Sequence, residues 1–264
     1  MNLFKKLAVA AGLAAAVGAA SATVVLPGSE QSLQSIINGL YTAAGATPAQ
    51  AAAAAPDVNA NQYAADERWR VEASGTTAAT FIIEITGGAL TNTFGVYSLT
   101  NPNAKVQLFG GAATSAFKAQ LSINNLGGGS VTYLDAGSNV TGFQNFAAGT
   151  LMGGEFGYYL GTGSGNPQSF FYSQSALNAG GSDQMVAYQG DGDTIRLPGQ
   201  NNGIWGSSSF ILAWEDTLYG NSDKDFNDLV LYVESVTGIP EPATLALVGL
   251  SLAGLGFASR RRKA

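Results

Sequence analysis

The sequence of 264 residues contains no cysteine and no histidine. Without cysteine, the chain cannot form a disulfide, use a thiol nucleophile or bind a metal through sulfur. Without histidine, it lacks the base of Ser-His-Asp and Cys-His hydrolases and the usual ligands of zinc. Any metal site must therefore be built from oxygen ligands.

Charged side chains are also scarce, at 11% of the residues, and they are unevenly distributed. Residues 1–22 and 238–264 hold six of the twelve basic residues but only one of the eighteen acidic ones. The body between these segments therefore carries a net charge of about −11. Such a body repels nucleic acid and attracts cations, so we expect no nucleic-acid partner.

Residues 1–22 have the features of a secretory signal peptide. Lys5 and Lys6 precede an apolar run over residues 7–20, and small residues stand at Ala20 and Ala22. Signal peptidase recognises this arrangement, so we expect cleavage before Thr23. Residues 23–239 would then lie outside the inner membrane.

Residues 240–264 fall into three blocks. A Pro-Glu-Pro segment at 240–242 forms a stiff spacer, because proline continues neither a helix nor a strand. Residues 243–259 carry no charge and as a helix would be roughly 25 Å long, at the short end of what crosses a bilayer. Basic residues at 260–263 would hold the C-terminal side in the cytoplasm. We expect a transmembrane helix here; a core helix or a frayed tail is the alternative.

This order of blocks resembles the PEP-CTERM sorting signal of Gram-negative bacteria. The residues that carry the resemblance are Pro240, Glu241, Pro242, Arg260, Arg261 and Arg262. The resemblance implies processing by exosortase, a membrane-embedded enzyme, and a cell-surface or exopolysaccharide-associated product. The protein would be anchored in the inner membrane on the periplasmic side before sorting, and would then reach the cell surface or the extracellular matrix.

One stretch of the exported body has helical periodicity. Apolar residues recur at i, i+3, i+4, i+7 and i+8, at Leu33, Ile36, Ile37, Leu40 and Tyr41. With Ser29 or Ser32 as the N-cap, residues 29–41 are predicted to form a short amphipathic helix packed on the domain. An Ala/Pro-rich linker or weak helix follows, so residues 23–64 are expected to precede the main domain.

Residues 65–237 have the alternating pattern of short strands separated by glycine-rich turns. The predicted strands are 68–73, 79–86, 93–99, 105–109, 117–123, 130–134, 155–160, 169–172, 184–189, 210–215 and 229–236. Evenly spaced short strands predict a mainly β domain, an antiparallel β-sandwich or jelly roll.

Eight of the eighteen acidic residues lie between positions 183 and 228. Side-chain oxygens recur along residues 221–228, as in loops that bind calcium. An EF-hand is excluded, because Asp228 stands where its turn needs glycine and a β-like run follows. The predicted metal ligands are Asp216, Asp223, Asp225, Asn227 and Asp228, with Asp191 and Asp193 from a neighbouring loop. The alternative is that these residues only stabilise a hairpin turn between strands 210–215 and 229–236.

The same segment carries a second resemblance. The run WED at 214–216 and SDKDFNDLV at 222–230 resembles the closing signature of a β-rich domain of unknown function in secreted bacterial proteins. The likeness extends more loosely to residue 80. It implies a fold and a location, but no activity.

The sequence therefore favours a non-enzymatic surface or matrix protein with a calcium-stabilised β domain. A carbohydrate-binding module is a second hypothesis, with Trp205 as the candidate for stacking on a sugar because it stands among glycines and serines. A glycosidase that uses Glu155 and Glu215 is a third, because such enzymes need two carboxylates across a cleft.

Overall fold

The computed structural model describes residues 23–72, 76–84, 92–111, 113–162 and 169–240. Residues 22–239 form one compact unit, which is mainly β. The predicted signal peptide and the predicted transmembrane helix at 243–259 lie outside the described residues. Among the described residues, no helix is long and apolar enough to cross a membrane.

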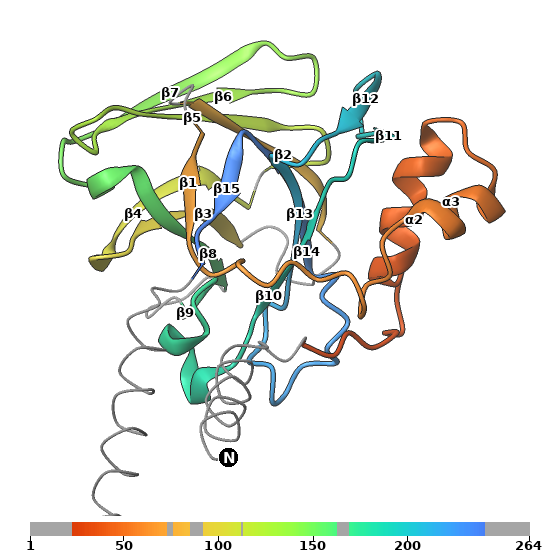
Figure 1. Ribbon diagram of the computed structural model, residues 1–264. Helices are drawn as coiled ribbons and strands as arrows, with labels where there is room; N and C mark the ends of the chain where they lie inside the picture. Colours follow the sequence, from red (N-terminus) through yellow and green to blue (C-terminus); the bar gives the residue numbers. More distant parts are fainter. Residues whose placement is uncertain (1–22, 73–75, 85–91, 112, 163–168, 241–264) are drawn as a thin grey trace, which may run out of the picture. The chain divides into compact units, whose positions relative to one another are not determined.

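Two antiparallel sheets make up most of the unit (Figure 1). The first runs in the order β15-β1-β8-β3-β4, with β9 also paired to β8. Its strands are β1 (Trp69–Val71), β3 (Thr93–Ser98), β4 (Asn101–Phe109), β8 (Glu155–Thr162), β9 (Ser169–Tyr172) and β15 (Val236–Gly238). The second runs in the order β10-β13-β14-β2-β5-β6-β7. Its strands are β2 (Thr76–Glu84), β5 (Lys118–Ile123), β6 (Gly129–Leu134), β7 (Val140–Phe146), β10 (Met185–Gln189), β13 (Ser209–Trp214) and β14 (Leu229–Glu234).

The two sheets enclose one hydrophobic core. The ring of Trp69 on β1 meets that of Phe210 on β13 with their centroids 4.8 Å apart, and Phe94 on β3 meets Trp214 at 6.0 Å. All four side chains are buried. Aromatic rings that cross between the sheets in this way contribute both buried area and edge-to-face contacts.

A second hydrophobic cluster covers the other face of β10, β13 and β14. It is formed with helix α2 (Leu33–Ala43), helix α3 (Pro48–Ala54) and the hairpin of β11 (Asp193–Arg196) and β12 (Asn202–Trp205). Because both faces are covered, every residue of β13 is buried, which explains its continuous apolar sequence.

The predicted helix is confirmed. All five of its periodic apolar residues are buried, and the N-cap is Ser32, whose side chain accepts a hydrogen bond from the amide of Ser35 at 3.3 Å. In the predicted linker, α3 forms with a capping box between Thr47 and Gln50.

Each predicted strand overlaps an observed one, and the mainly β prediction is confirmed. The jelly-roll topology stays a prediction. Sequence reasoning missed β7, β11, β12 and β15. β7 is exposed along most of its length and has no apolar alternation, and the other three have only three or four residues each.

Candidate metal centre

The acidic loop joins β13 to β14 at one end of the second sheet. Trp214 pairs with Leu229 as the last residue pair of the hairpin, so Glu215 and Asp228 leave the sheet next to each other. The predicted hairpin between these strands is therefore confirmed. Its connection, residues 215–228, is far longer than a tight turn requires.

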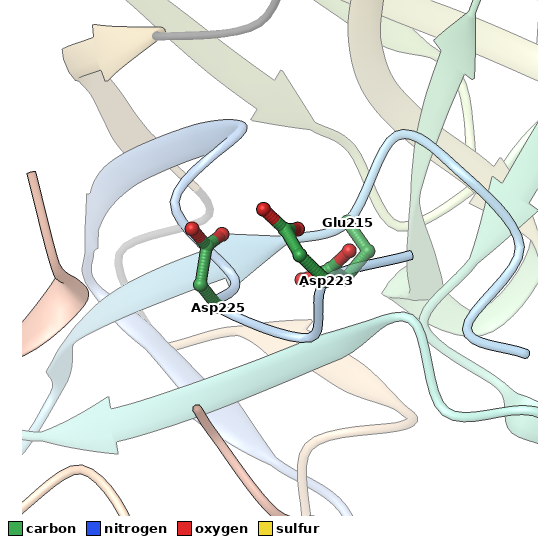
Figure 2. Close-up of side chains that lie close together, drawn as sticks. All are labelled: Glu215, Asp223 and Asp225. Carbon is green, nitrogen blue, oxygen red and sulfur yellow. The ribbon is translucent and has the colours of Figure 1, made fainter. Parts of the chain in front are cut away.

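Three carboxylates of this loop converge. One oxygen each from Glu215, Asp223 and Asp225 lies within 4.8 Å of the others, and Figure 2 shows the three side chains gathered together. Glu215 and Asp225 are 0% and 1% exposed, whereas Asp223 is exposed. Three carboxylates at this separation repel one another unless a cation offsets their charge.

Glu215 is the most buried member of the cluster. Its Oε1 accepts a hydrogen bond from the Phe226 amide at 2.7 Å, but its Oε2 is buried with no hydrogen-bond partner among the described residues. Burial raises the pKa of Glu215 and the charges of Asp223 and Asp225 add to this rise, whereas the Phe226 amide and the nearby Ser222 hydroxyl counter it. The Ser222 hydroxyl donates to the Tyr219 carbonyl at 3.3 Å, so it does not satisfy Oε2. A buried carboxylate oxygen without a donor is costly, because it has lost its hydration.

Asp225 is held rigidly from two sides. Its carboxylate accepts hydrogen bonds from the Asn227 amide at 3.3 Å and from Asn227 Nδ2 at 2.8 Å. On the other side the segment before α2 is in close contact, since a Cβ added to Gly28 would overlap Asp225 Oδ2. Burial and then the charge of Asp223 raise the pKa of Asp225.

The backbone of the loop takes up positive φ at two alternate residues, on either side of Asp225. Lys224 and Phe226 both have positive φ, at 66° and 52°. Phe226 is 0% exposed and belongs to the second cluster, so it anchors the loop. Lys224, the only basic residue of the loop, has its Nζ 4.8 Å above the centroid of the Tyr219 ring. It makes no ion pair with the three carboxylates.

Asp216 and Asp228 form a separate pair at the base of the loop. Asp228 Oδ2 accepts a hydrogen bond from the Asp216 amide at 2.8 Å, and Asn92 Nδ2 donates to Asp216 Oδ2 at 3.3 Å. Burial is the main cause that raises the pKa of Asp228, and the neighbouring Asp216 carboxylate adds to it.

Of the predicted metal ligands, the structure brings Asp223 and Asp225 together. Asn227 lies beside them, but its Nδ2 donates to Asp225 and to the carbonyl of Gln31, so it orients a ligand. Glu215 was missed as a ligand because the pattern sought was one of alternating Asp and Asn. Its position directly after the apolar run at residues 210–214 was the available signal.

Asp191 and Asp193 do not belong to this site, contrary to the prediction. β10 is antiparallel to β13, with Gln189 paired to Phe210 and Met185 to Trp214. Asp191 therefore leaves the sheet where β13 begins and Glu215 where it ends, about 20 Å apart at roughly 3.3 Å per residue.

The structure places the candidate residues of the carbohydrate-binding and glycosidase hypotheses where they do not fit those roles. Trp205 is not in a loop but on β12, is 1% exposed and donates its indole N–H to the Ser209 carbonyl at 3.0 Å, so it offers no ring face to a sugar. A cleft of about 630 Å³ lies above it, between α3 and the end of β10. Glu155 lies in the other sheet, on β8, where it pairs with Arg68 at 3.2 Å.

All the converging ligands are carboxylate oxygens, which suit a hard cation such as calcium or magnesium. The three-carboxylate cluster can therefore hold such an ion, with Asp223 on the side open to solvent.

Comparison with known families gives two matches. Residues 238–263 match the PEP-CTERM protein-sorting motif, and residues 146–236 match a family described as domain of unknown function (DUF4114). The second match begins at residue 146, so residues 80–145 fall outside it. No curated protein and no solved structure matches the chain.

Proposed function

From the PEP-CTERM sorting motif that this chain carries directly after its β domain, we propose that it is a surface or matrix protein whose exported domain is stabilised by calcium. The motif means that the protein is exported and is associated with the membrane before exosortase sorts it. The final location at the cell surface or among exopolysaccharide, the metal and the non-enzymatic role form the proposal.

The observation that supports calcium best is the buried Oε2 of Glu215. It has no donor among the described residues and shares its surroundings with Asp223 and Asp225. A divalent cation would offset two of the three negative charges and coordinate the unpaired oxygen at about 2.3–2.6 Å. Turn chemistry alone accounts for Asn227 and Asp225, but not for a buried glutamate.

The position of the cluster suits a structural ion. The cluster lies where loop 215–228 meets the segment before α2, and the Leu26 amide donates to the Lys224 carbonyl at 2.8 Å. An ion there would fix the loop against which that earlier segment packs. Because the unfolded chain cannot assemble the cluster, binding would stabilise the fold by about 2.7 kcal/mol at a calcium concentration 100 times the Kd.

A structural role is favoured over catalysis because Glu215 and Asp225 are almost completely buried. A polymeric substrate cannot reach them, and only Asp223 faces solvent. Sites of this kind in extracellular modules bind calcium with a Kd of about 10⁻⁴–10⁻³ M, which suits conditions outside the cell.

Thermal unfolding of residues 23–239 in EDTA and in 10 mM calcium tests the proposal. We expect calcium to raise the Tm by several degrees and Glu215→Gln to remove most of that rise. The amide keeps an acceptor for the Phe226 N–H but removes a buried charge, so this variant should be at least as stable as the parent in EDTA.

Asp191→Asn is the matched control, because Asp191 is an exposed acid at the opposite end of β13. It should keep the full response to calcium. An unchanged Tm in the parent, or an equal loss of response in both variants, would rule out this site.

A further inference from the structure

A second acidic group lies where the predicted signal peptide ends. Thr23, the residue after the expected cleavage position, donates a hydrogen bond from its hydroxyl to Asp183 Oδ2. The Thr23 carbonyl accepts a hydrogen bond from Gln62 Nε2 at 2.6 Å. Two independent contacts thus hold the side chain and the backbone carbonyl of this residue against the domain.

The following residues are fixed as well. The Val25 amide donates to Asn59 Oδ1 at 2.8 Å, and Asn59 Nδ2 donates back to the Val25 carbonyl at 3.0 Å. The Val25 side chain is buried in the second hydrophobic cluster. The position of Thr23 is therefore set by the folded domain, and the domain keeps these contacts after the leader is removed.

The carboxylates around Thr23 lack a positive partner. Asp66 and Asp183 are both half-buried, and burial raises the pKa of each, with the charge of Asp183 adding to the rise at Asp66. Among the described residues neither acid is in an ion pair. Glu67 is nearby, but its Oε1 is taken up by Ser175, whose amide donates to it at 3.1 Å.

Tyrosine hydroxyls complete the surroundings. Tyr219 donates to the Val24 carbonyl at 3.4 Å and Tyr188 to the Val58 carbonyl at 2.8 Å. Asp66 acts electrostatically on Tyr63, as Asp183 does on Tyr219, and burial is the first cause that raises both tyrosine pKa values. All these phenols are neutral below pH 9, so none offsets the two carboxylates.

Removal of the leader creates a cation at this point. Hydrolysis of the Ala22–Thr23 peptide bond adds one water, leaving a carboxylate on Ala22 and an amine on Thr23. That amine takes up a proton, because an α-amino group has a pKa of about 7.7–8.0. Before cleavage the same nitrogen is a neutral amide with one hydrogen.

We propose that Asp183, assisted by Asp66, forms a binding site for the α-ammonium group of Thr23 that signal peptidase releases. The Thr23 nitrogen lies two bonds from the carbon that bears the hydroxyl bound to Asp183, so the ammonium is within reach of the same carboxylate. In the uncleaved chain these two half-buried acids have no ion-pair partner among the described residues, and processing places one positive charge beside them. The fold is thereby completed by processing.

Chains that run to Ala264, kept in detergent and released from a tag, test this. One begins at Thr23 and the other at Ala22, so the second has its ammonium one residue away from the site. We expect the chain that begins at Thr23 to have a Tm higher by several degrees, and its α-amino pKa to exceed the ordinary value when measured by NMR.

Asp183→Asn separates ion pairing from a merely structural role, because its effect on the Tm should differ between the chain that begins at Thr23 and the chain that begins at Ala22. In the chain that begins at Thr23 it removes the partner of the ammonium and should lower the Tm. In the chain that begins at Ala22 it removes a half-buried charge that has no ion-pair partner among the described residues, and should leave the Tm unchanged or raise it. Asp135→Asn, at a half-exposed acid in the turn between β6 and β7, should not alter the difference between the two chains.

The pH dependence follows from the raised pKa of the bound ammonium. The advantage of the chain that begins at Thr23 should be full below the unfolded α-amino pKa of about 7.7–8.0, and should be lost as the pH rises through the folded value. Equal Tm values for the two chains would overturn the proposal. So would N-terminal sequencing of the exported protein that found a first residue other than Thr23.

Discussion

At the scale of single residues, Gly28 shows how the metal centre depends on a missing side chain. The Asp225 carboxylate occupies the volume that a Cβ of Gly28 would need. No positive φ is involved at this glycine, so its role is to leave room. The contact joins a segment near the start of the domain to a loop near its end.

Gly28→Ala should therefore displace Asp225 and weaken calcium binding. We expect a loss of about 1–3 kcal/mol in the free energy of unfolding, the usual cost of overpacking, and a smaller response of the Tm to calcium. Urea denaturation with and without calcium measures both effects.

Gly39→Ala is its control, because a Cβ at this position in α2 meets nothing within 4 Å. That change should stabilise the protein by up to about 1 kcal/mol, since alanine favours a helix. A Gly28→Ala protein that keeps the full calcium response would mean that Asp225 is not a ligand.

At the scale of secondary-structure elements, β7 is the unusual strand. It forms one edge of the second sheet, and among the described strands β6 alone pairs with it. Its sequence VTGFQNF contains no charge and no proline, and Val140 and Phe143 are 66% and 61% exposed. Edge strands usually carry charges or proline that prevent pairing with another chain.

We expect β7 to promote self-association, and Phe143→Lys to reduce it. The change in stability should stay within about 0.5 kcal/mol, because the side chain is exposed. Light scattering over a range of protein concentrations measures the association.

Leu126→Lys, at a residue that is 67% exposed in the turn between β5 and β6, is the comparison. It should leave association unchanged. If both substitutions reduced association equally, exposed apolar surface in general would be responsible, and the strand edge would not.

At the scale of the whole molecule, charge is poorly balanced. The body carries a net charge of about −11, and the structure has one ion pair between fully described partners, Arg68 with Glu155. Mutual repulsion among the acids opposes folding, and dissolved ions screen it over a Debye length of about 10 Å at 0.1 M salt.

Sodium chloride should therefore raise the Tm of residues 23–239 in EDTA, gradually and without saturation at one site. Calcium should act at far lower concentration, because it binds a defined cluster. Differential scanning calorimetry over both salt series distinguishes the two effects, and a Tm that fell as sodium chloride rose would contradict the repulsion argument.

Much of this fold could be predicted from local pattern. The helix followed from the spacing of Leu33, Ile36 and Ile37, and the central strands followed from apolar runs bounded by glycine. The short β11 and β12 could not be predicted, because they are stabilised by covering β10 and β13 and not by their own sequence.

The sequence predicted which loop holds the candidate site, but it did not predict all the residues that form it. The density of acids near residue 225 located the loop, whereas the burial of Glu215 depends on contacts with Phe226 that no spacing rule contains. The same limit applies to Trp205, whose glycine-rich neighbours suggested a loop although the structure places it as the one buried residue of the otherwise exposed strand β12.

The last strand, β15, limits where a sorting enzyme can cut. Gly238 pairs with Trp69, and the Ile239 amide donates to the Arg68 carbonyl at 2.7 Å, yet the matched motif already begins at residue 238. A cut before Ile239 would keep β15 but remove the hydrogen bond from the Ile239 amide to the Arg68 carbonyl that continues its pairing with β1. Scission at or beyond Pro240 would keep this hydrogen bond as well, so the fold sets the point after which a cut leaves every described strand pairing in place.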